Sequence, residues 1–357
     1  MNPRARGAFQ RRLLAWFRAH RRDLPWRRSR DPYRVWVAEV MLQQTRIAAV
    51  LPYYRRFLEK FPQVTSLARA RQEDVLKLWS GLGYYSRARN LRRAAKEIVV
   101  RYGGKFPQSL AEALRLPGVG RYTAAAVLSI AYDMPLAVLD GNVARVLARL
   151  SAMRGDVRAP RNWKAVGSRA EELLATEASG DWNQALMELG ETVCTPQSPR
   201  CPQCPVERWC RARALGLVEE IPEARRKPRA VHVKIAAAIL RDPQGRTLMV
   251  KDPGAHDGVL FSRMWQFPAV EVARHAKAEL GEHLRATLGI EPPILEDLAE
   301  ARHAVTDRNV QLLAFLGRVP LLPKRLRTRI VPLEALARLP ISSATLKIAQ
   351  AALGARG

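Results

Sequence analysis

The sequence predicts a mostly helical front of about 220 residues followed by a smaller α+β tail. Three observations support this prediction. From Phe9 to about Leu215, apolar residues recur every three or four positions and are punctuated by Gly, Pro, Asn and Asp. The segment 222–230, PEARRKPRA, is charged, rich in proline and short of large apolar residues, which is typical of a linker. After it, VHVKIAAAIL (231–240), DPQG and RTLMV (246–250) follow one another as strand, turn and strand.

Local signals place the individual elements. Asp31 followed by Pro32 indicates a helix that begins with an N-cap and a first-turn proline. In the tail, KAELGEHLRATLGI (277–290) predicts a helix, and AEARHAVTDRNVQLLAFLG (299–317) predicts two strands around a polar turn. The domains we expect are a helical domain at residues 1–220, a linker at 221–230 and an α+β domain at 231–357.

The first 22 residues are rich in arginine and amphipathic. Such a segment can be a transit peptide or the first helix of the protein. The helical spacing of Phe9, Leu13, Leu14, Trp16 and Phe17 favours the helix. Because no apolar signal core precedes it, we expect a cytoplasmic, nucleoid-associated protein of prokaryotic type.

The charge points to a polyanionic partner. Lys and Arg number 60 against 33 Asp and Glu, a formal net charge of +27. A charge of this size concentrates polyanions around the protein, and nucleic acid is the leading candidate. An anionic membrane is the weaker alternative, because the sequence has no long apolar run. We expect a monomer that does not bind membranes.

All four cysteines fall within one short segment. Cys194, Cys201, Cys204 and Cys210 are separated by gaps of six, two and five residues. This crowding indicates a metal or cluster site rather than dispersed disulfides. Four thiolates on one loop can hold a cubane iron–sulfur cluster or a zinc ion. Zinc knuckles usually pair two CxxC units and only one is present, so a 4Fe-4S cluster is favoured, as a structural staple on a DNA-facing loop.

A glycine turn lies in LPGVGRYTAAA (116–126). Pro117, Gly118 and Gly120 leave backbone N–H groups open, and the helix that begins near Tyr122 adds its positive end. A DNA phosphate fits such a site, and it is held there without reading the base sequence. An ordinary turn uses the same residues. The helical patterns on both sides, together with the charge, favour a helix-hairpin-helix that docks on the DNA backbone.

These motifs resemble a known superfamily. LPGVGRYTA, VLDGNVARVL (138–147) and the C-x6-C-x2-C-x5-C loop are similar to the endonuclease III superfamily of base-excision DNA glycosylases. EVMLQQT (39–45) and GLGYYSRARNL (81–91) resemble its adenine DNA glycosylases. The resemblance spans Leu24 to Cys210. It implies a helix-hairpin-helix glycosylase with a six-helix barrel, and double-stranded DNA with adenine opposite 8-oxoguanine or guanine as the substrate.

Two carboxylates are candidates for the chemistry. Breaking an N-glycosidic bond requires a proton for the leaving base and stabilisation of a cationic sugar, tasks that two carboxylates can divide. Glu39 lies among Val, Trp, Ala and Met, so partial burial would raise its pKa and suit it as general acid. By resemblance it delivers the proton to adenine N7 and then serves as base toward water; the alternative is a solvated helix carboxylate. Asp140 reads as an N-cap whose N–H bonds keep it ionised, and the same carboxylate suits a stabiliser or transient nucleophile at the sugar.

Tyr122 indicates the type of glycosylase. Bifunctional members of the superfamily carry a lysine at this position, whose amine forms a Schiff base with the sugar. A phenol cannot form that imine, so the resemblance implies a monofunctional enzyme that leaves the strand whole. An aromatic side chain on a helix surface is the alternative for Tyr122. Asn142 matches the family position that, with Tyr122, orients the catalytic groups.

Further positions follow from the resemblance alone. Each of them could also be ordinary helix surface or core. Gln43 and Gln44, placed on the same helix as Glu39, resemble the residues that fill the vacated base stack. Leu82 and Tyr84 resemble a wedge and a probe near the opposite base. Trp26, Arg27 and Gln184 match positions that line the adenine pocket.

The tail resembles a Nudix domain that recognises the opposite base, with MWQFPAVEV (264–272) as its core strand region. The candidate helix offers Glu279 and Glu282 but no REXXEE run, so we expect neither phosphohydrolase activity nor a catalytic magnesium ion. The family's recognition turn reads Phe-Ser-His after His-Ala. Here His303-Ala304 is followed by Val305, Thr306 and Asp307.

This turn departs from the family in charge and shape. Thr306 keeps a hydroxyl, Val305 lacks the aromatic ring, and Asp307 adds negative charge near DNA unless Arg302 or Arg308 offsets it. The sequence therefore leaves three alternatives open beside a monofunctional adenine glycosylase that acts on adenine opposite 8-oxoguanine or guanine. These are relaxed opposite-base specificity, a noncatalytic DNA-damage binding protein that intact Glu39 and Asp140 oppose, and a glycosylase with lyase action that Tyr122 opposes.

Overall fold

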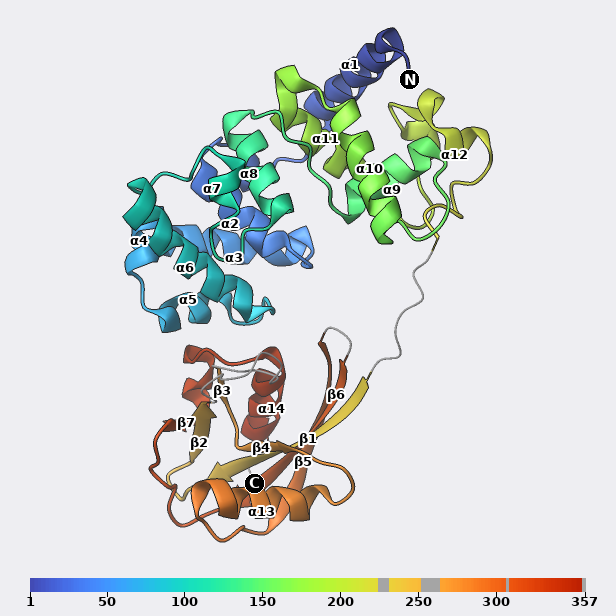
Figure 1. Cartoon of the computed structure of the whole chain (residues 1–357). Helices are drawn as coiled ribbons and strands as arrows, with labels where there is room; N and C mark the ends of the chain where they lie inside the picture. Colours follow the sequence, from blue (N-terminus) through green and yellow to red (C-terminus); the bar gives the residue numbers. More distant parts are fainter. Residues whose placement is uncertain (224–230, 252–263, 306–307, 355–357) are drawn as a thin grey trace. The chain divides into compact units, whose positions relative to one another are not determined.

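Helices build the first part of the chain and a mixed β-sheet builds the last (Figure 1). The computed structural model describes residues 1–223, 231–251, 264–305 and 308–354. The chain divides into two compact units. One comprises Met1–Ala70 and Arg89–Arg226, and the other comprises Arg71–Ala88 and Lys227–Gly357. Most of the predicted linker lies outside the described residues.

The first unit is helical, as the sequence predicts. Its elements are α1 (Pro3–His20), η1 (Pro25–Arg27), α2 (Pro32–Leu42), α3 (Ile47–Lys60), α4 (Val64–Arg69), most of α6 (Tyr85–Tyr102), α7 (Leu110–Ala113), α8 (Arg121–Tyr132), α9 (Gly141–Ser151), α10 (Pro160–Leu173), η2 (Thr176–Ala178), α11 (Ser179–Thr192), η3 (Cys201–Gln203), η4 (Glu207–Trp209) and α12 (Arg211–Ala214). The second unit takes α5 (Gln72–Trp79) and the start of α6.

Capping residues begin two of these helices. The side chain of Asn2 accepts a hydrogen bond from the backbone N–H of Ala5 and starts α1. Asp31 does the same for Tyr33 at the start of α2, and Pro32 takes the first helical position. The predicted N-terminal helix and the predicted Asp31 cap are therefore both confirmed.

A single core joins the first helix to the helices that carry the site. Phe9, Leu13 and Phe17 are fully buried on one stripe of α1 and pack against α9 and α11. The ring of Phe9 meets the edge of Trp182 on α11 at 5.6 Å between centroids. This packing holds α9 and α11 side by side. None of the helices among the described residues is long and apolar enough to span a bilayer.

The second unit contains a seven-stranded sheet in the order β3-β2-β1-β6-β5, with β4 paired to β1 and β7 to β2. The long strands β1 and β6 run parallel, and the other pairs are antiparallel. The strands are β1 (Val231–Arg241), β2 (Arg246–Lys251), β3 (Trp265–Gln266), β4 (Ala269–Glu271), β5 (Leu295–Val305), β6 (Arg308–Arg318) and β7 (Thr328–Pro332). The helical elements are α13 (Ala276–Leu288), η5 (Leu333–Arg338) and α14 (Ser343–Gly354).

Alternation along β1 gives the sheet its two covered faces. Ala236, Ala238 and Leu240 pack in the cluster that includes α13, while Ala237 and Ile239 pack in the cluster that includes α14. The unit is thus the α+β domain that the sequence predicts, with a mixed sheet and flanking helices.

The two predicted hairpins of the tail are present. The strands β1 and β2 pair around DPQG. The strands β5 and β6 pair with each other, as the sequence predicts. The MWQFPAVEV segment forms two short strands, β3 and β4, rather than one. Glu279 accepts three hydrogen bonds from the backbone N–H groups of residues 273–275, so its carboxylate closes the start of α13.

Candidate active site

A cavity of about 750 Å³ opens in the helical unit. Its wall brings together the end of α2, the loop to α3, the starts of α8 and α9, and one stripe of α11. It contains side chains with carboxylate, phenol, amide and guanidinium groups, a mixture expected of a site that holds a polar ligand. The predicted site residues among its lining are Trp26, Arg27, Glu39, Gln43, Gln44, Tyr122, Asp140, Asn142 and Gln184.

Glu39 is the most deeply placed carboxyl group of the cavity. It lies on α2 with 5 % of its surface exposed. Burial raises its pKa, the negative charge of Asp140 adds to this, and a hydrogen bond from Tyr122 opposes it, so that the pKa is about 7. The apolar neighbours in the sequence predicted this direction, and burial is more complete than the partial burial expected.

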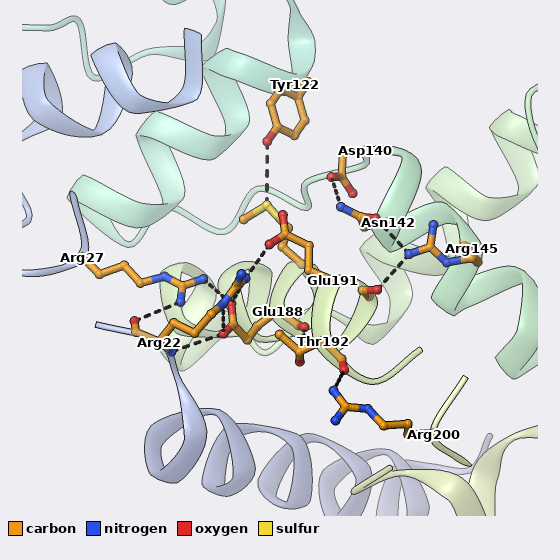
Figure 2. Close-up of polar contacts among 12 residues, drawn as sticks. Arg22, Arg27, Tyr122, Asp140, Asn142, Arg145, Glu188, Glu191, Thr192 and Arg200 are labelled. Atoms are coloured by element: carbon orange, nitrogen blue, oxygen red, sulfur yellow. Dashed lines mark hydrogen bonds and ion pairs between the residues drawn. The ribbon is translucent and has the colours of Figure 1, made fainter. Parts of the chain in front are cut away.

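Tyr122 points into the cavity from the first turn of α8. Its hydroxyl donates a 2.6 Å hydrogen bond to Oε2 of Glu39. It also lies 3.7 Å from Sδ of Met187, the sulfur at the end of the dashed line from Tyr122 in Figure 2. The alternative of an aromatic side chain on the helix surface is therefore wrong. The residue before it, Arg121, begins α8, and Gly120 is the N-cap.

The two glutamines do not lie on the helix of Glu39, contrary to the prediction. α2 ends at Leu42, and Gln43 is its C-cap. Gln44 has a φ of 56°, a left-handed conformation that cannot continue a right-handed helix. Gln43 reaches across to α8 and donates a 3.1 Å hydrogen bond to Oγ1 of Thr123. Both glutamines still line the cavity, because the chain turns along its rim.

Asp140 caps α9 and faces the same cavity. Its Oδ1 accepts a 2.7 Å hydrogen bond from the backbone N–H of Val143, and Nδ2 of Asn142 lies 3.4 Å from Oδ2 (Figure 2). The predicted N-cap is thus confirmed. These donors favour the ionised form, as expected, but burial outweighs them and raises the pKa of Asp140.

Arg145 fixes Asn142 from one turn further along α9. Its Nη2 donates 2.9 Å hydrogen bonds to Oδ1 of Asn142 and to the carbonyl of Gly190, and its Nε donates one to the carbonyl of Cys194. α11 crosses closely here, because a Cβ on Gly190 would lie 2.8 Å from Cβ of Asn142. Glycine at this position lets the two helices meet.

An ion-pair network that sequence reasoning missed holds Arg27 of the expected adenine pocket. Trp26, Arg27 and Gln184 line the cavity as expected. Arg27 donates to Glu188 at 2.8 Å, and Arg22 donates to Glu188 through Nε and Nη2 at 2.7 Å each. Burial alone would raise the pKa of Glu188, but the two arginines outweigh it and lower the pKa to about 2.

The signal for this ion-pair network was present in the sequence. Glu188 follows Gln184 by one helical turn, Arg27 belongs to the matched Trp26-Arg27 pair, and Arg22 precedes that pair. No single motif joins residues 22 and 188, so only the fold could pair them.

The hairpin turn has its own steric requirement. Gly118 has a φ of +75°, and a Cβ there would lie 2.6 Å from Cβ of Asn90. Nothing lies within 4 Å of the corresponding position on Gly120. The short α7 and the longer α8 flank the turn, in agreement with the predicted helix-hairpin-helix.

Leu82 and Tyr84 belong to the second unit. Leu82 is buried, whereas Tyr84 is 41 % exposed and has a φ of 48°. The guanidinium of Arg87 lies 5.3 Å from the ring of Tyr84. Of the two predicted contact residues, Tyr84 is the one that presents an exposed ring.

The four cysteines line one small cavity beside α9. All four are free thiols. Arg149 on α9 donates to Sγ of Cys194 at 3.3 Å and to the carbonyls of Thr195 and Pro196, which ties the loop to the helix. Among the residues that the structure describes, no three His, Cys, Asp or Glu side chains are arranged to hold a single ion. Four thiols around one cavity are a donor set that a metal ion or an iron–sulfur cluster can use.

The recognition turn is only partly described. Thr306 and Asp307 lie outside the described residues, and of His303, Ala304 and Val305 only the backbone of β5 is described. Arg302, a candidate partner for Asp307, instead donates a 3.1 Å hydrogen bond to Glu300.

The sequence and the fold match known DNA-repair enzymes. The profile of the HhH-GPD superfamily of base excision DNA repair proteins matches residues 37–167. The adenine DNA glycosylase of Mus musculus is 38 % identical over 349 residues, which cover 83 % of this chain and 68 % of the mouse protein. That of Rattus norvegicus is 38 % identical over 372 residues, covering 88 % and 72 %.

Solved structures agree for the helical unit. A thermostable thymine-DNA glycosylase superimposes with a TM-score of 0.53 at 30 % identity, over 59 % of this chain and 97 % of its own. An endonuclease III trapped as a covalent intermediate with DNA gives a TM-score of 0.52 at 25 % identity, over 61 % and 99 %.

The fold and the cavity thus define a base-excision repair protein of the HhH-GPD superfamily. Within that superfamily, the identity to the two rodent enzymes over most of both chains settles the branch. The chain belongs to the adenine DNA glycosylases.

Proposed function

We propose that this protein is a monofunctional glycosylase that hydrolyses the N-glycosidic bond of adenine mispaired with 8-oxoguanine or guanine in DNA. One observation carries the proposal. Glu39, with a pKa of about 7, shares a cavity with Asp140 and is bonded to Tyr122. A buried carboxylic acid and a second carboxyl group in one pocket are the two groups that glycosidic cleavage uses.

The hydrogen bond from Tyr122 directs the proton of Glu39. Because the phenol donates to Oε2, the acid proton of Glu39 resides on Oε1 and is free to face a ligand. Glu39 donates this proton to N7 of an adenine turned out of the duplex. The bond between N9 and the sugar breaks, its electron pair leaves with the base, and positive charge develops on the sugar.

Asp140 lies at the other side of the reaction. Its carboxylate stabilises the cationic sugar, either through space or as a transient nucleophile. Water then adds to the sugar carbon and passes a proton to Glu39, which restores the acid. Asn142, bonded to Arg145, supports Asp140 from the same turn of α9.

Tyr122 supports the monofunctional assignment. No amine takes its place in the cavity wall, and its phenol is already bonded to Glu39. A Schiff base with the sugar would require a lysine amine at this point. Borohydride should therefore trap no covalent complex between protein and DNA.

The cysteine loop suits a 4Fe-4S cluster held by Cys194, Cys201, Cys204 and Cys210. A tetrahedral zinc ion would need four sulfurs within about 2.3 Å of one point. The single CxxC unit among the four cysteines favours the larger cubane over such a zinc site. When bound, it would cross-link the loop that Arg149 ties to α9. Purified protein should then contain about four irons per chain.

The experiment that tests the function is single-turnover release of adenine at fixed salt from two duplexes, with adenine opposite 8-oxoguanine or opposite guanine. A much faster rate on the first supports lesion recognition by the turn at residues 305–307. Equal rates support the relaxed specificity that Asp307 suggests. Binding without release on either duplex would instead support a noncatalytic DNA-damage binding protein.

A further inference from the structure

A third carboxylate faces the cavity from α11. Gln184, Met187 and Glu191 are spaced by three and four residues, so they form one stripe of the helix, and all three line the cavity. Glu188 lies between them in sequence but is buried outside this lining, against Arg22 and Arg27. Glu191 is therefore the acidic residue of α11 that the bound base and sugar would meet.

Glu191 is held in place from one side. Nη2 of Arg22 donates to its Oε2, and its side chain is 32 % exposed (Figure 2). In Figure 2, Glu191 rises from α11 with Arg22 on one side and with Asp140 and Asn142 on the other. One oxygen of this carboxylate is thus engaged by Arg22, and the residue lines the cavity.

Its charge is only partly neutralised. Arg22 already makes two 2.7 Å hydrogen bonds to Glu188, and the Nη2 atom that binds Glu191 is one of the donors involved. Arg22 is 37 % exposed, and an ion pair in contact with water contributes little energy. The guanidinium of Arg27 also donates to Glu188, so its charge is engaged there.

The negative charge of Glu191 acts on both catalytic carboxyl groups. Burial is the main reason that the pKa values of Glu39 and Asp140 are raised, and Glu191 shifts each further in the same direction. Several other charged or titratable groups share the cavity or bind these residues. They are Arg22, Arg27, Arg46, Arg145, Arg158, Tyr122 and Glu188. At Asp140 the effect of Glu191 on the pKa exceeds the opposing effect of Arg145, whereas at Glu39 the opposing effect of Arg27 is larger than that of Glu191.

We propose that Glu191, anchored by Arg22, is a positioning residue for adenine excision, which places a negative charge on the wall of the cavity that the two catalytic carboxyl groups share with the cationic sugar. The inference rests on the proposed glycosylase function. It assigns Glu191 a role through its charge, whereas a merely structural role would only hold the Arg22 segment against α11.

The test compares three variants with the wild type in single-turnover excision between about pH 5.5 and about pH 9. Glu191→Gln removes the charge and keeps the shape. Glu191→Asp keeps the charge. Glu97→Gln is the matched control, because Glu97 pairs with Arg101 on α6 and does not line the cavity.

We expect Glu191→Gln to move the falling limb of the rate profile to lower pH and to slow excision about two- to fivefold near neutrality. Glu191→Asp should restore most of the rate, and Glu97→Gln should match the wild type. A profile that keeps its midpoint in Glu191→Gln, even with a uniformly lower rate, overturns the proposal.

A second readout separates this inference from the proposed function. Carbon-13 NMR of the Glu39 carboxyl in the free protein, assigned with Glu39→Gln, reports its titration without any substrate. The midpoint should fall in Glu191→Gln, and an unchanged midpoint overturns the role of Glu191. If the wild type releases no adenine, the glycosylase proposal fails and the catalytic role of Glu191 falls with it, whatever the titration shows.

Discussion

The hydroxyl of Tyr122 donates a 2.6 Å hydrogen bond to Oε2 of Glu39, and this contact joins α8 to α2 across the catalytic cavity. It connects the residue that decides against lyase chemistry with the residue proposed as the acid. The bond favours the ionised form of Glu39, while burial favours the protonated form more strongly. The pKa of about 7 is the outcome of this opposition.

The wild-type rate should depend on pH in one clear direction. The acid must be protonated to act, so single-turnover excision should be fastest below about pH 7 and fall tenfold per unit well above it. A pH series with saturating enzyme measures this. A rate that rises steadily through pH 7 to 9 would assign another group as the proton donor.

Tyr122→Phe removes the hydroxyl and keeps the ring. In the wild type, the hydrogen bond from Tyr122 lowers the pKa of Glu39. Without this bond the pKa rises, so the falling limb of the rate profile should move to higher pH. Excision near neutrality should also slow about tenfold, since the carboxyl is no longer held by a charge-assisted bond. Identical profiles for the variant and the wild type would show that the bond has no part in the reaction.

Glu39→Gln should stabilise the protein at alkaline pH. The pKa of Glu39 rises from 4.5 to about 7 on folding, so ionising it costs the folded state stability as the pH rises through this window. The loss amounts to about 3 kcal/mol above pH 7 and is absent below about pH 4. Thermal unfolding of both proteins at pH 5 and pH 8 measures it, and an equal gap at the two pH values would refute it.

Gly190→Ala should weaken the crossing of α9 and α11. The new methyl group would lie 2.8 Å from Cβ of Asn142, so the helices must separate. We expect a loss of about 1–3 kcal/mol in the free energy of unfolding and slower excision, because Asn142 moves with α9. Gly167→Ala is the control within α10, where the nearest atom is 3.7 Å away. Equal stability of the two variants would contradict a close crossing.

Local sequence signals predicted much of the fold. The cap at Asp31, the amphipathic spacing of Phe9 and Phe17, and the strand–turn–strand pattern around DPQG all depend on residues near in sequence. Such patterns record how one element meets the core, and the structure confirms them. The sequence placed Gln43 and Gln44 on the helix of Glu39, because no glycine marks the left-handed turn at Gln44 that follows the end of α2.

Pairings across the chain were harder to predict. Glu39 and Tyr122 came together only through the family resemblance, and nothing local linked Arg22 to Glu188 or Glu191. The burial that raises the pKa of Asp140 could not be predicted for a related reason. Its N–H donors could be predicted from the cap, but its burial comes from helices that the sequence does not place.

The most direct measurement is adenine release from an A:8-oxoguanine duplex by Glu39→Gln under single-turnover conditions, beside the wild type and Glu97→Gln. We predict that Glu39→Gln binds the duplex but releases adenine at least about 100-fold more slowly, because general acid catalysis contributes on that scale. Glu97→Gln should keep the wild-type rate. Release by Glu39→Gln at the rate of the wild type would show that the buried carboxyl of α2 is not the acid, and the mechanism proposed for this cavity would have to be abandoned.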